Sequence, residues 1–453
     1  MPQRFHDVSR EHDQHTDPYR QRLACAEAPL ECPECWLVVL ARLSLRQLQR
    51  VGCVSRAFHV LISDETLWRR LCVRRAAANH APLTFSGCWR NSALGGRDCR
   101  GDDAPSSAEL KSCEPLGVFL CEKYWRALPR VHAPSAAAFL CGFDLPQCPV
   151  CLVGVDVGLD AASCSLASLR RTHGRKSFAC SVQESRLPPA RMTLDGFAEY
   201  LHQAREPEPV YLFEPRPPAE LSARTPISIG RDYACELEQA DHLCGTRRWL
   251  VVGGIRSGSR FHTDPFATSC AMPPTPPPIW PSPPPLPPPL CVRFHHGVAS
   301  QRPPSYSAAS RRRSPRRAWN VVLQGRKLWA FYPPGPPPPG VRLLPAADGA
   351  ESIGFVAPPA AQWFAEVRPQ LDRCSSPCYE IVQQVGEIVF VPAGWWHCVL
   401  NIDAETVAFT ENVITDGNVA SAADEFARAG DVETAALLLD LERAAHKGSA
   451  ETR

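Results

Sequence analysis

The sequence has no long apolar run and no excess of charge of one sign. Across its 453 residues no apolar stretch approaches the roughly 20 residues of a membrane-spanning helix, so no membrane association is expected. The 49 basic and 47 acidic residues give a net charge of +2, which argues against a protein that mainly wraps nucleic acid. The first twenty residues, MPQRFHDVSREHDQHTDPYR, are polar and charged, so no signal peptide is expected.

Cysteine and proline, by contrast, are abundant. The 21 cysteines could indicate a secreted disulfide scaffold, but they are scattered through a large chain, which favours a reducing compartment. Two CxxC pairs, Cys32/Cys35 and Cys148/Cys151, lie too far apart in the sequence to form one zinc site. They are interpreted as structural or incidental thiols. Much of the excess among the 47 prolines lies in two short stretches.

The N-terminal part predicts a small helical domain. Residues 1–28 lack an apolar period and are expected to be disordered, whereas residues 29–75 carry apolar residues at helical spacing, with Ser44 and Asp64 as expected N-caps. The segment PLECPECWLVVLARLSLRQLQRVGCVSRAFHVLISDETLWRRLCVRR resembles an F-box. That resemblance implies docking on the adaptor of a cullin-type ubiquitin ligase through the apolar edge of the helices. A purely structural helical cap on the next domain is the alternative.

The remainder predicts a β-rich domain. Residues 76–112 are rich in Gly, Ser, Asp and Ala and are interpreted as a linker. Within residues 113–415, an amphipathic helix over 192–205 and a strand over 209–215 precede several β-branched and aromatic runs separated by Gly or Pro turns. Such runs are typical of an antiparallel barrel or jelly roll. Residues 416–453 carry two helical patterns broken near Gly430.

One segment, residues 270–317, interrupts the β-rich pattern. It contains the tract PPTPPPIWPSPPPLPPPL, which lacks backbone donors and cannot join a sheet, and a Ser/Arg-rich run ending SRRRSPRR. The tract could recruit SH3- or WW-type partners. The run could contact RNA, serve as a nuclear-localisation patch, or be a solvated tail. A retained intron is a further alternative, because excising the segment restores a continuous pattern.

Three residues point to a metal site. His262 and Asp264 follow a β-run two residues apart, so on an extended strand their side chains point the same way. His397 lies in VPAGWWHCVLNI, a second expected strand. Two imidazoles and one carboxylate match the facial triad of non-haem iron(II), which leaves positions for a bidentate cosubstrate and O2. Zinc accepts similar ligands, but the sequence lacks a His-Glu-x-x-His pattern.

The spacing of these ligands makes sense once the insert is set aside. The outer ligands His262 and His397 are too far apart for a compact barrel, but removing residues 270–317 joins RSGSRFHTDPFATS to AWNVVLQGRKLWAFYP. The joined string, with GWWHCVLN later, closely resembles the JmjC oxygenases, in the branch of the bifunctional arginine demethylase and lysyl hydroxylase. The match covers residues 116–415, insert excepted. It implies a mainly-β fold: a double-stranded β-helix, or cupin-like jelly roll, with flanking helices. A small all-α F-box-like domain precedes it, as in plant and algal relatives.

The resemblance implies roles for four further residues. Lys327 would place its ammonium against the distal carboxylate of 2-oxoglutarate, and Thr410 and Tyr211 would hydrogen-bond the same carboxylate. Asn320 would lie near the metal-chelating end of the cosubstrate. The alternatives are an exposed strand lysine at 327 and ordinary interior partners at the other three positions. Four tryptophans are interpreted as core packing: Trp319, Trp329, Trp395 and Trp396.

The function implied is that of a protein oxygenase dependent on iron(II), 2-oxoglutarate and O2. Its expected substrates are histones or other basic proteins, by lysine hydroxylation or by demethylation of methyl-arginine or methyl-lysine. The alternative is a substrate receptor of a cullin-type ubiquitin ligase that uses the JmjC barrel only for binding. A nuclear location is expected, with the cytoplasm as a second one. The C-terminal helices could pack on the barrel or mediate a homodimer.

Overall fold

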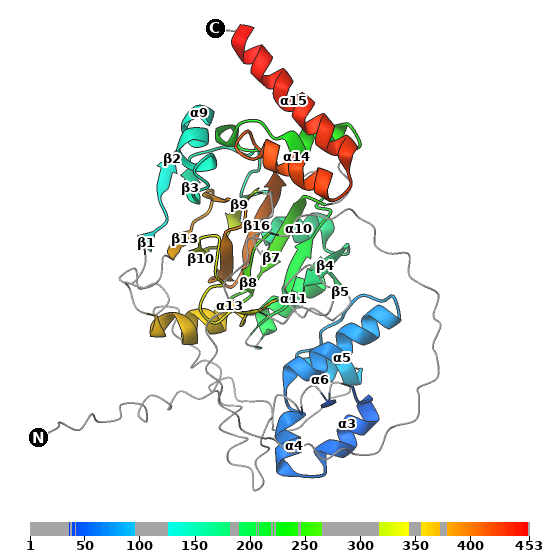
Figure 1. Ribbon diagram of the computed structural model, residues 1–453. Coiled ribbons are helices and arrows are strands. Elements are labelled where there is room, and N and C mark those ends of the chain that lie inside the picture. The colour runs from blue at the N-terminus through cyan, green and yellow to red at the C-terminus, as the bar shows by residue number, and fades with distance from the viewer. Residues whose placement is uncertain are drawn as a thin grey trace, which may run out of the picture.

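The computed structural model describes residues 36, 39–40, 42–95, 126–181, 190–204, 206, 208–218, 221, 223–242, 246–264, 317–343, 355–371 and 378–451. Four predictions concern segments outside these residues: disorder over 1–28, the Cys32/Cys35 pair, the linker over 96–112 and the character of the insert up to residue 316. None of the described helices is both long and apolar enough to cross a membrane. Figure 1 shows the N-terminal helices beside a larger β-rich body, with further helices at the C-terminal end of the chain.

The N-terminal helices are α3 (Leu45–Gly52), α4 (Arg56–Leu61), α5 (Glu65–Ala78) and α6 (Trp89–Leu94). Ser44 caps α3 in a capping box and Asp64 caps α5 through the N–H of Thr66, so both predicted N-caps are confirmed. Helix α6 and the end of α5 lie in the segment interpreted as a linker. That interpretation is wrong for residues 76–95, where Trp89 is fully buried. A six-residue helix is too short to show an apolar period.

Two sheets make up the β-rich body. The first has the order β1-β13-β10-β15-β8, and the second β2-β3-β14-β9-β16-β7-β6-β4-β5. Strands of the first are β1 (Arg126–Ala127), β13 (Tyr379–Gln383), β10 (Lys327–Tyr332), β15 (Trp396–Asn401) and β8 (Gly258–His262). Strands of the second are β2 (Arg130–His132), β3 (Val150–Val153), β14 (Ile388–Val391), β9 (Arg317–Gln324), β16 (Thr406–Val413), β7 (Arg248–Gly253), β6 (Tyr211–Glu214), β4 (Ser177–Ser181) and β5 (Ala190–Thr193). β11 (Arg342–Leu343) and β12 (Phe355–Val356) form a separate two-stranded antiparallel sheet.

The two sheets face each other across one apolar interior. Trp329, Phe331 and Val399 of the first sheet belong to the same buried cluster as Val389 and Val391 of the second. A jelly roll of this kind places alternate residues of every strand inside. The predicted mainly-β, cupin-like fold with flanking helices is confirmed.

Helices cover the outside of the sheets. The helical segments of the β-rich body are α9 (Ala136–Phe139), η3 (Leu140–Asp144), α10 (Leu166–His173), α11 (Leu194–Gln203), η5 (Ile227–Ile229), α12 (Tyr233–Gln239), α13 (Ala360–Gln362), η7 (Trp363–Val367), η8 (Arg368–Gln370), α14 (Val419–Arg428) and α15 (Val432–Glu451). Helix α11 and strand β6 confirm the helix and strand predicted over 192–205 and 209–215. Gly430 separates α14 from α15 as predicted, and it adopts a positive φ of 88°.

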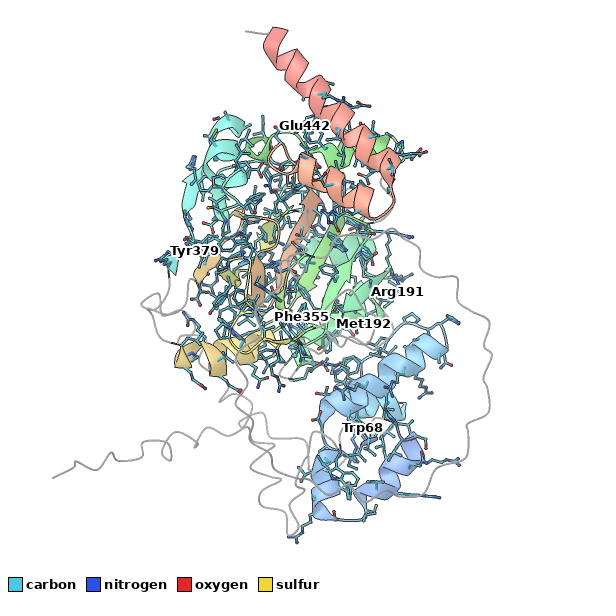
Figure 2. All side chains as sticks on the ribbon, viewed as in Figure 1. Trp68, Arg191, Met192, Phe355, Tyr379 and Glu442 are labelled. Carbon is cyan, nitrogen blue, oxygen red and sulfur yellow. The ribbon has the colours of Figure 1, made fainter. Side chains whose placement is uncertain are left out.

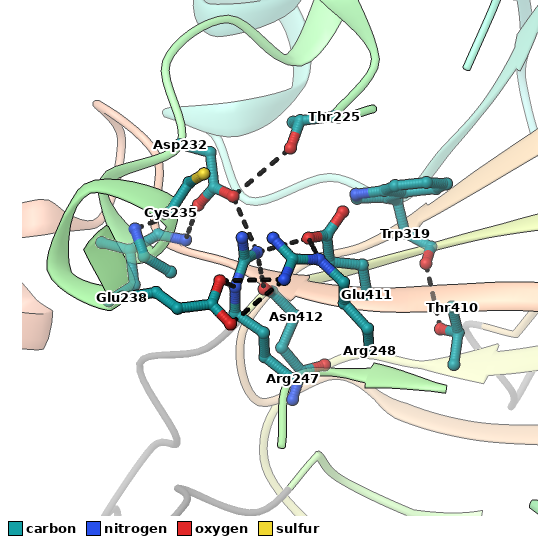
Figure 3. Close-up of polar contacts among 12 residues, drawn as sticks. Thr225, Asp232, Cys235, Glu238, Arg247, Arg248, Trp319, Thr410, Glu411 and Asn412 are labelled. Carbon is teal, nitrogen blue, oxygen red and sulfur yellow. Dashed lines mark hydrogen bonds and ion pairs between the residues drawn. The ribbon is translucent and has the colours of Figure 1, made fainter. Parts of the chain in front are cut away.

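A buried network of charges attaches α12 to the sheet. The Arg247 guanidinium, 2% exposed, donates to Asp232 Oδ2 at 2.9 Å and also to the buried carboxylate of Glu411 on β16 (Figure 3). Glu238 of α12 accepts from both Arg247 and Arg248. Charges removed from water remain only where they are paired, so this network fixes α12, and the helices packed on it, to the second sheet.

After the segment that is not described, β9 begins at Arg317. Its fully buried guanidinium pairs with Asp144 and donates to Thr415 Oγ1 at 2.5 Å and to the Gly417 carbonyl at 3.0 Å. The insert was predicted to end at residue 317, so that boundary is one residue too late. A single arginine at the end of an Arg-rich run gives no local sign that tertiary partners bury it.

Candidate metal centre

Three potential ligands meet at one end of the barrel interior. His262 is the last residue of β8, and it lies directly opposite His397 of β15 in the antiparallel register. Asp264 follows two residues after His262, and its Oδ1 lies 3.7 Å from Nε2 of each histidine. All three ligand atoms lie within 4.8 Å of one another. The fold therefore brings together the residues that the sequence predicts as the triad.

Hydrogen bonds orient both imidazoles. His262 Nδ1 lies 2.7 Å from the Arg260 carbonyl oxygen, and His397 Nδ1 lies 3.1 Å from that of Trp395. A carbonyl oxygen only accepts, so each Nδ1 carries the proton and each Nε2 presents its lone pair to the shared space. Burial, with the charge on His262 as a second cause, lowers the pKa of His397 to about 4. The donor set is thus two imidazole nitrogens and one carboxylate oxygen, which fits iron(II).

Lys327 supplies a buried positive charge on the neighbouring strand. Its side chain on β10 is 1% exposed, so the alternative of an exposed strand lysine is wrong. The ammonium donates to Tyr211 Oη at 2.9 Å and Asn401 Oδ1 at 3.0 Å, and burial lowers its pKa to about 7. Among the described residues no carboxylate forms an ion pair with it. A desolvated ammonium without a counter-charge fits an anionic ligand.

Asn320 and Thr410 stand opposite each other on the second sheet. Thr410 Oγ1 donates to the Trp319 carbonyl at 3.0 Å (Figure 3). Asn320 is 5% exposed, and its Oδ1 has no hydrogen-bond partner within the described part of the chain. A buried amide oxygen without a partner is costly, so it marks a place where a ligand or water belongs.

The sequence did not single out Asn401. It pairs with Lys327 in the β10–β15 register, and its amide bridges the lysine to Ser257 Oγ at 2.9 Å. A signal was available, because Asn401 lies four residues after His397 on one strand and therefore on the same face. The four tryptophans expected to pack in the core are all buried, as predicted: Trp319, Trp329, Trp395 and Trp396.

Comparison with protein families agrees with this geometry. The F-box-like family model matches residues 33–74, and the model of the JmjC domain, hydroxylase, matches residues 359–413. The chain contains an F-box-like domain and a JmjC domain. The JmjC match includes His397 and Thr410 but stops short of His262, Asp264 and Lys327. The fold joins both parts, since β8 and β10 flank β15 in one sheet of the JmjC domain.

Relatives extend the similarity over most of the chain. Lysine-specific demethylase JMJ21 and arginine-specific demethylase JMJ22 of Arabidopsis thaliana are each 26% identical over 84% of this chain, covering 36% and 67% of their own lengths. The bifunctional arginine demethylase and lysyl-hydroxylase psr-1 of Caenorhabditis briggsae is 26% identical over 64% of this chain and 63% of its own length. The chain thus spans about a third of the first relative and about two thirds of the others. The predicted resemblance to this branch is confirmed.

Proposed function

We propose that the chain is an iron(II)- and 2-oxoglutarate-dependent protein oxygenase that acts on basic side chains. The observation that carries the proposal is an open three-ligand cluster sharing one barrel with the uncompensated ammonium of Lys327. When bound, iron(II) with 2-oxoglutarate and O2 supplies an oxidant that hydroxylates a C–H bond, with succinate and CO2 as co-products.

The chain's own residues hold and orient these groups. Lys327 and Tyr211 would bind the distal carboxylate of 2-oxoglutarate, as the resemblance implies, and Asn401 would hold the lysine ammonium in place. Phe331, opposite His397, lies four residues after Lys327, so both point into the interior from positions roughly 13 Å apart along β10. A lysine side chain and a five-carbon dicarboxylate together span that distance. Trp329 stacks at 6.1 Å from His397 and helps to exclude water there.

Basic side chains of proteins are the proposed substrates. The relatives' names specify lysine, arginine or both, so the shared chemistry is a cationic side chain, as in a histone tail. Mass spectrometry of a methylated and unmethylated basic peptide library, incubated with Fe(II) and 2-oxoglutarate, tests this. Gain of one oxygen indicates hydroxylation, and loss of a methylene indicates demethylation through collapse to formaldehyde. If no basic peptide changes mass or stimulates succinate formation, the barrel is a binding module instead.

A second role as receptor of a cullin-type ubiquitin ligase is compatible with the first. The F-box-like domain exposes three large apolar side chains, Trp36, Val39 and Val54, at 39%, 50% and 70% exposure. Such exposed apolar side chains fit an adaptor interface.

We expect Val54→Glu to weaken co-purification of the ligase adaptor roughly tenfold, because it places a charge in an apolar contact. Ile227→Glu is the matched control, since Ile227 is 83% exposed on the JmjC domain. Equal adaptor binding by wild type and Val54→Glu would show that the adaptor does not dock there. No adaptor bound to wild type would leave the helices as a structural cap.

We further propose a nuclear location and a homodimer through α15, where Val432 and Leu439 remain 64% and 39% exposed. Fluorescence of a tagged chain tests the first, and sedimentation of wild type against Val432→Glu tests the second.

SH3, WW or RNA partners of the insert concern residues outside the described part. Pull-down with an insert peptide tests those partners.

A further inference from the structure

Strand β8 is irregular immediately before the metal ligand. His262 lies opposite His397, but Ser259 lies opposite Val399, so three steps along β8 match two steps along β15. This register shift is a β-bulge, and it falls at Arg260 and its neighbour. A bulge redirects side chains, and here it lets His262 face the interior while the Arg260 side chain leaves it. Bulges cost ladder hydrogen bonds, so something must hold this one.

Glu208 holds the bulge through Arg260. The Arg260 guanidinium donates bidentately, from Nε to Oε1 at 2.7 Å and from Nη2 to Oε2 at 2.5 Å, and Nη1 reaches the Ala357 carbonyl at 3.3 Å. The two side chains are 27% and 12% exposed. A bidentate, largely buried pair of this kind is stronger and more directional than an exposed one. The backbone carbonyl of the same arginine accepts the Nδ1 proton of His262.

The F-box-like domain reaches the same segment. Arg69 of α5 donates from Nη1 to the Glu208 carbonyl oxygen at 2.6 Å. Two residues earlier, Glu206 accepts at Oε1 from Trp89 of α6 at 2.6 Å and from Tyr200 of α11 at 2.5 Å.

The contact between the domains extends to the sheet. The N–H of Leu83 donates to the carbonyl of Arg191 at 2.6 Å, and Figure 2 shows Arg191 on the side of the JmjC domain that faces the F-box-like helices. The buried cores of both domains form one cluster. Arg69 of α5 therefore contacts Glu208, Glu208 pairs with Arg260, and the Arg260 carbonyl orients the metal ligand.

We propose that Arg260 and Glu208 are positioning residues for the metal ligand His262, and that the F-box-like domain supports them through Arg69. The pair fixes the bulge, the bulge fixes the Arg260 carbonyl, and that carbonyl fixes the tautomer and direction of the imidazole. Metal affinity is sensitive to such outer partners, whose loss typically costs ten- to a hundredfold. The inference rests on the proposed metal centre, and it makes the F-box-like domain part of the oxygenase.

The test is Co(II) titration of the full-length, metal-free protein, followed by visible absorption. Glu208→Gln keeps the shape of the side chain but removes its charge, and we expect a dissociation constant about tenfold higher. The ligand-field bands should also shift, because His262 binds poorly. Arg260→Lys keeps the charge but loses the bidentate geometry, so an intermediate loss is expected. Arg69→Lys should change affinity in the same direction and by less.

The matched control is Glu236→Gln, which removes a bidentate Arg–Glu pair of similar exposure on α12, away from the metal centre. Its affinity and bands should equal those of wild type. If Glu208→Gln binds Co(II) like wild type, the inference is overturned while the proposed function stands. If wild type binds no Co(II), both fall. Should circular dichroism show that Glu208→Gln is unfolded, Arg260→Lys decides: wild-type affinity and bands there overturn the inference.

Discussion

His262→Ala should lower turnover on the order of a thousandfold or more and abolish tight metal binding. One imidazole supplies a third of the protein's donor set, and its loss removes several kcal/mol of interaction with the ion. His262 is the better ligand to replace, because its side chain is 31% exposed and that of His397 only 6%. Removing the more exposed ring leaves a smaller cavity, so folding should be retained. Succinate formation and Co(II) titration measure the two losses.

His202→Ala is the matched control for this substitution. The side chain of His202 is 61% exposed and lies 3.6 Å from Glu405, outside the ligand cluster. Its replacement should leave turnover unchanged. Because ligands to one ion act as a unit, His262→Ala/His397→Ala should be hardly worse than His262→Ala alone. Full multiplication of the two effects, or wild-type activity of His262→Ala, would contradict a single centre built from both strands.

The sequence sufficed for the parts of the site that obey local rules. His262 and Asp264 are two residues apart, and a motif on each strand identified the strands. The caps Ser44 and Asp64 were likewise predictable, because an N-cap is a local hydrogen bond. The register that sets His262 opposite His397 was not predicted, because β pairing between distant segments leaves no local trace in the sequence.

The features that were missed depend on tertiary contacts. Trp89 stands in a Gly- and Ser-rich stretch, yet its ring contacts the distant residues Glu206 and Tyr200. Arg317 ends an arginine run, yet Asp144 makes it a core residue. In both cases the partner lies far away in the sequence, so no window around the residue could indicate burial. The Arg260–Glu208 pair could not be predicted for the same reason, because β6, η5, α12 and β7 lie between its two residues in the chain.

Lys327→Met should raise the KM for 2-oxoglutarate about a hundredfold and yet stabilise the ligand-free fold. With 2-oxoglutarate bound, the substitution removes one partner of a buried charge pair, which costs several kcal/mol of binding free energy. Without the cosubstrate, the ammonium has no counter-charge among the described residues, so methionine removes the cost of burying it. A lysine with a purely structural role would change both quantities in the unfavourable direction. Thermal unfolding and initial rates measure them. Lys176→Met, at an exposed position, is the control and should change neither.

The lowered pKa of Lys327 also predicts how the stability of the ligand-free protein changes with pH. Burial lowers its pKa from 10.5 to about 7, so between these values the unfolded chain holds the proton and the folded chain does not. Stability of the ligand-free protein should therefore rise with pH from about 7 to about 10.5, and the contribution should be absent in Lys327→Met.

A carboxylate bound beside Nζ of Lys327 raises the pKa of the lysine again. Binding of 2-oxoglutarate to the Mn(II)-loaded protein near pH 8.5 should then take up close to one proton, measured by calorimetry in buffers of different ionisation enthalpy. Binding without proton uptake would mean that the dicarboxylate lies elsewhere in the barrel.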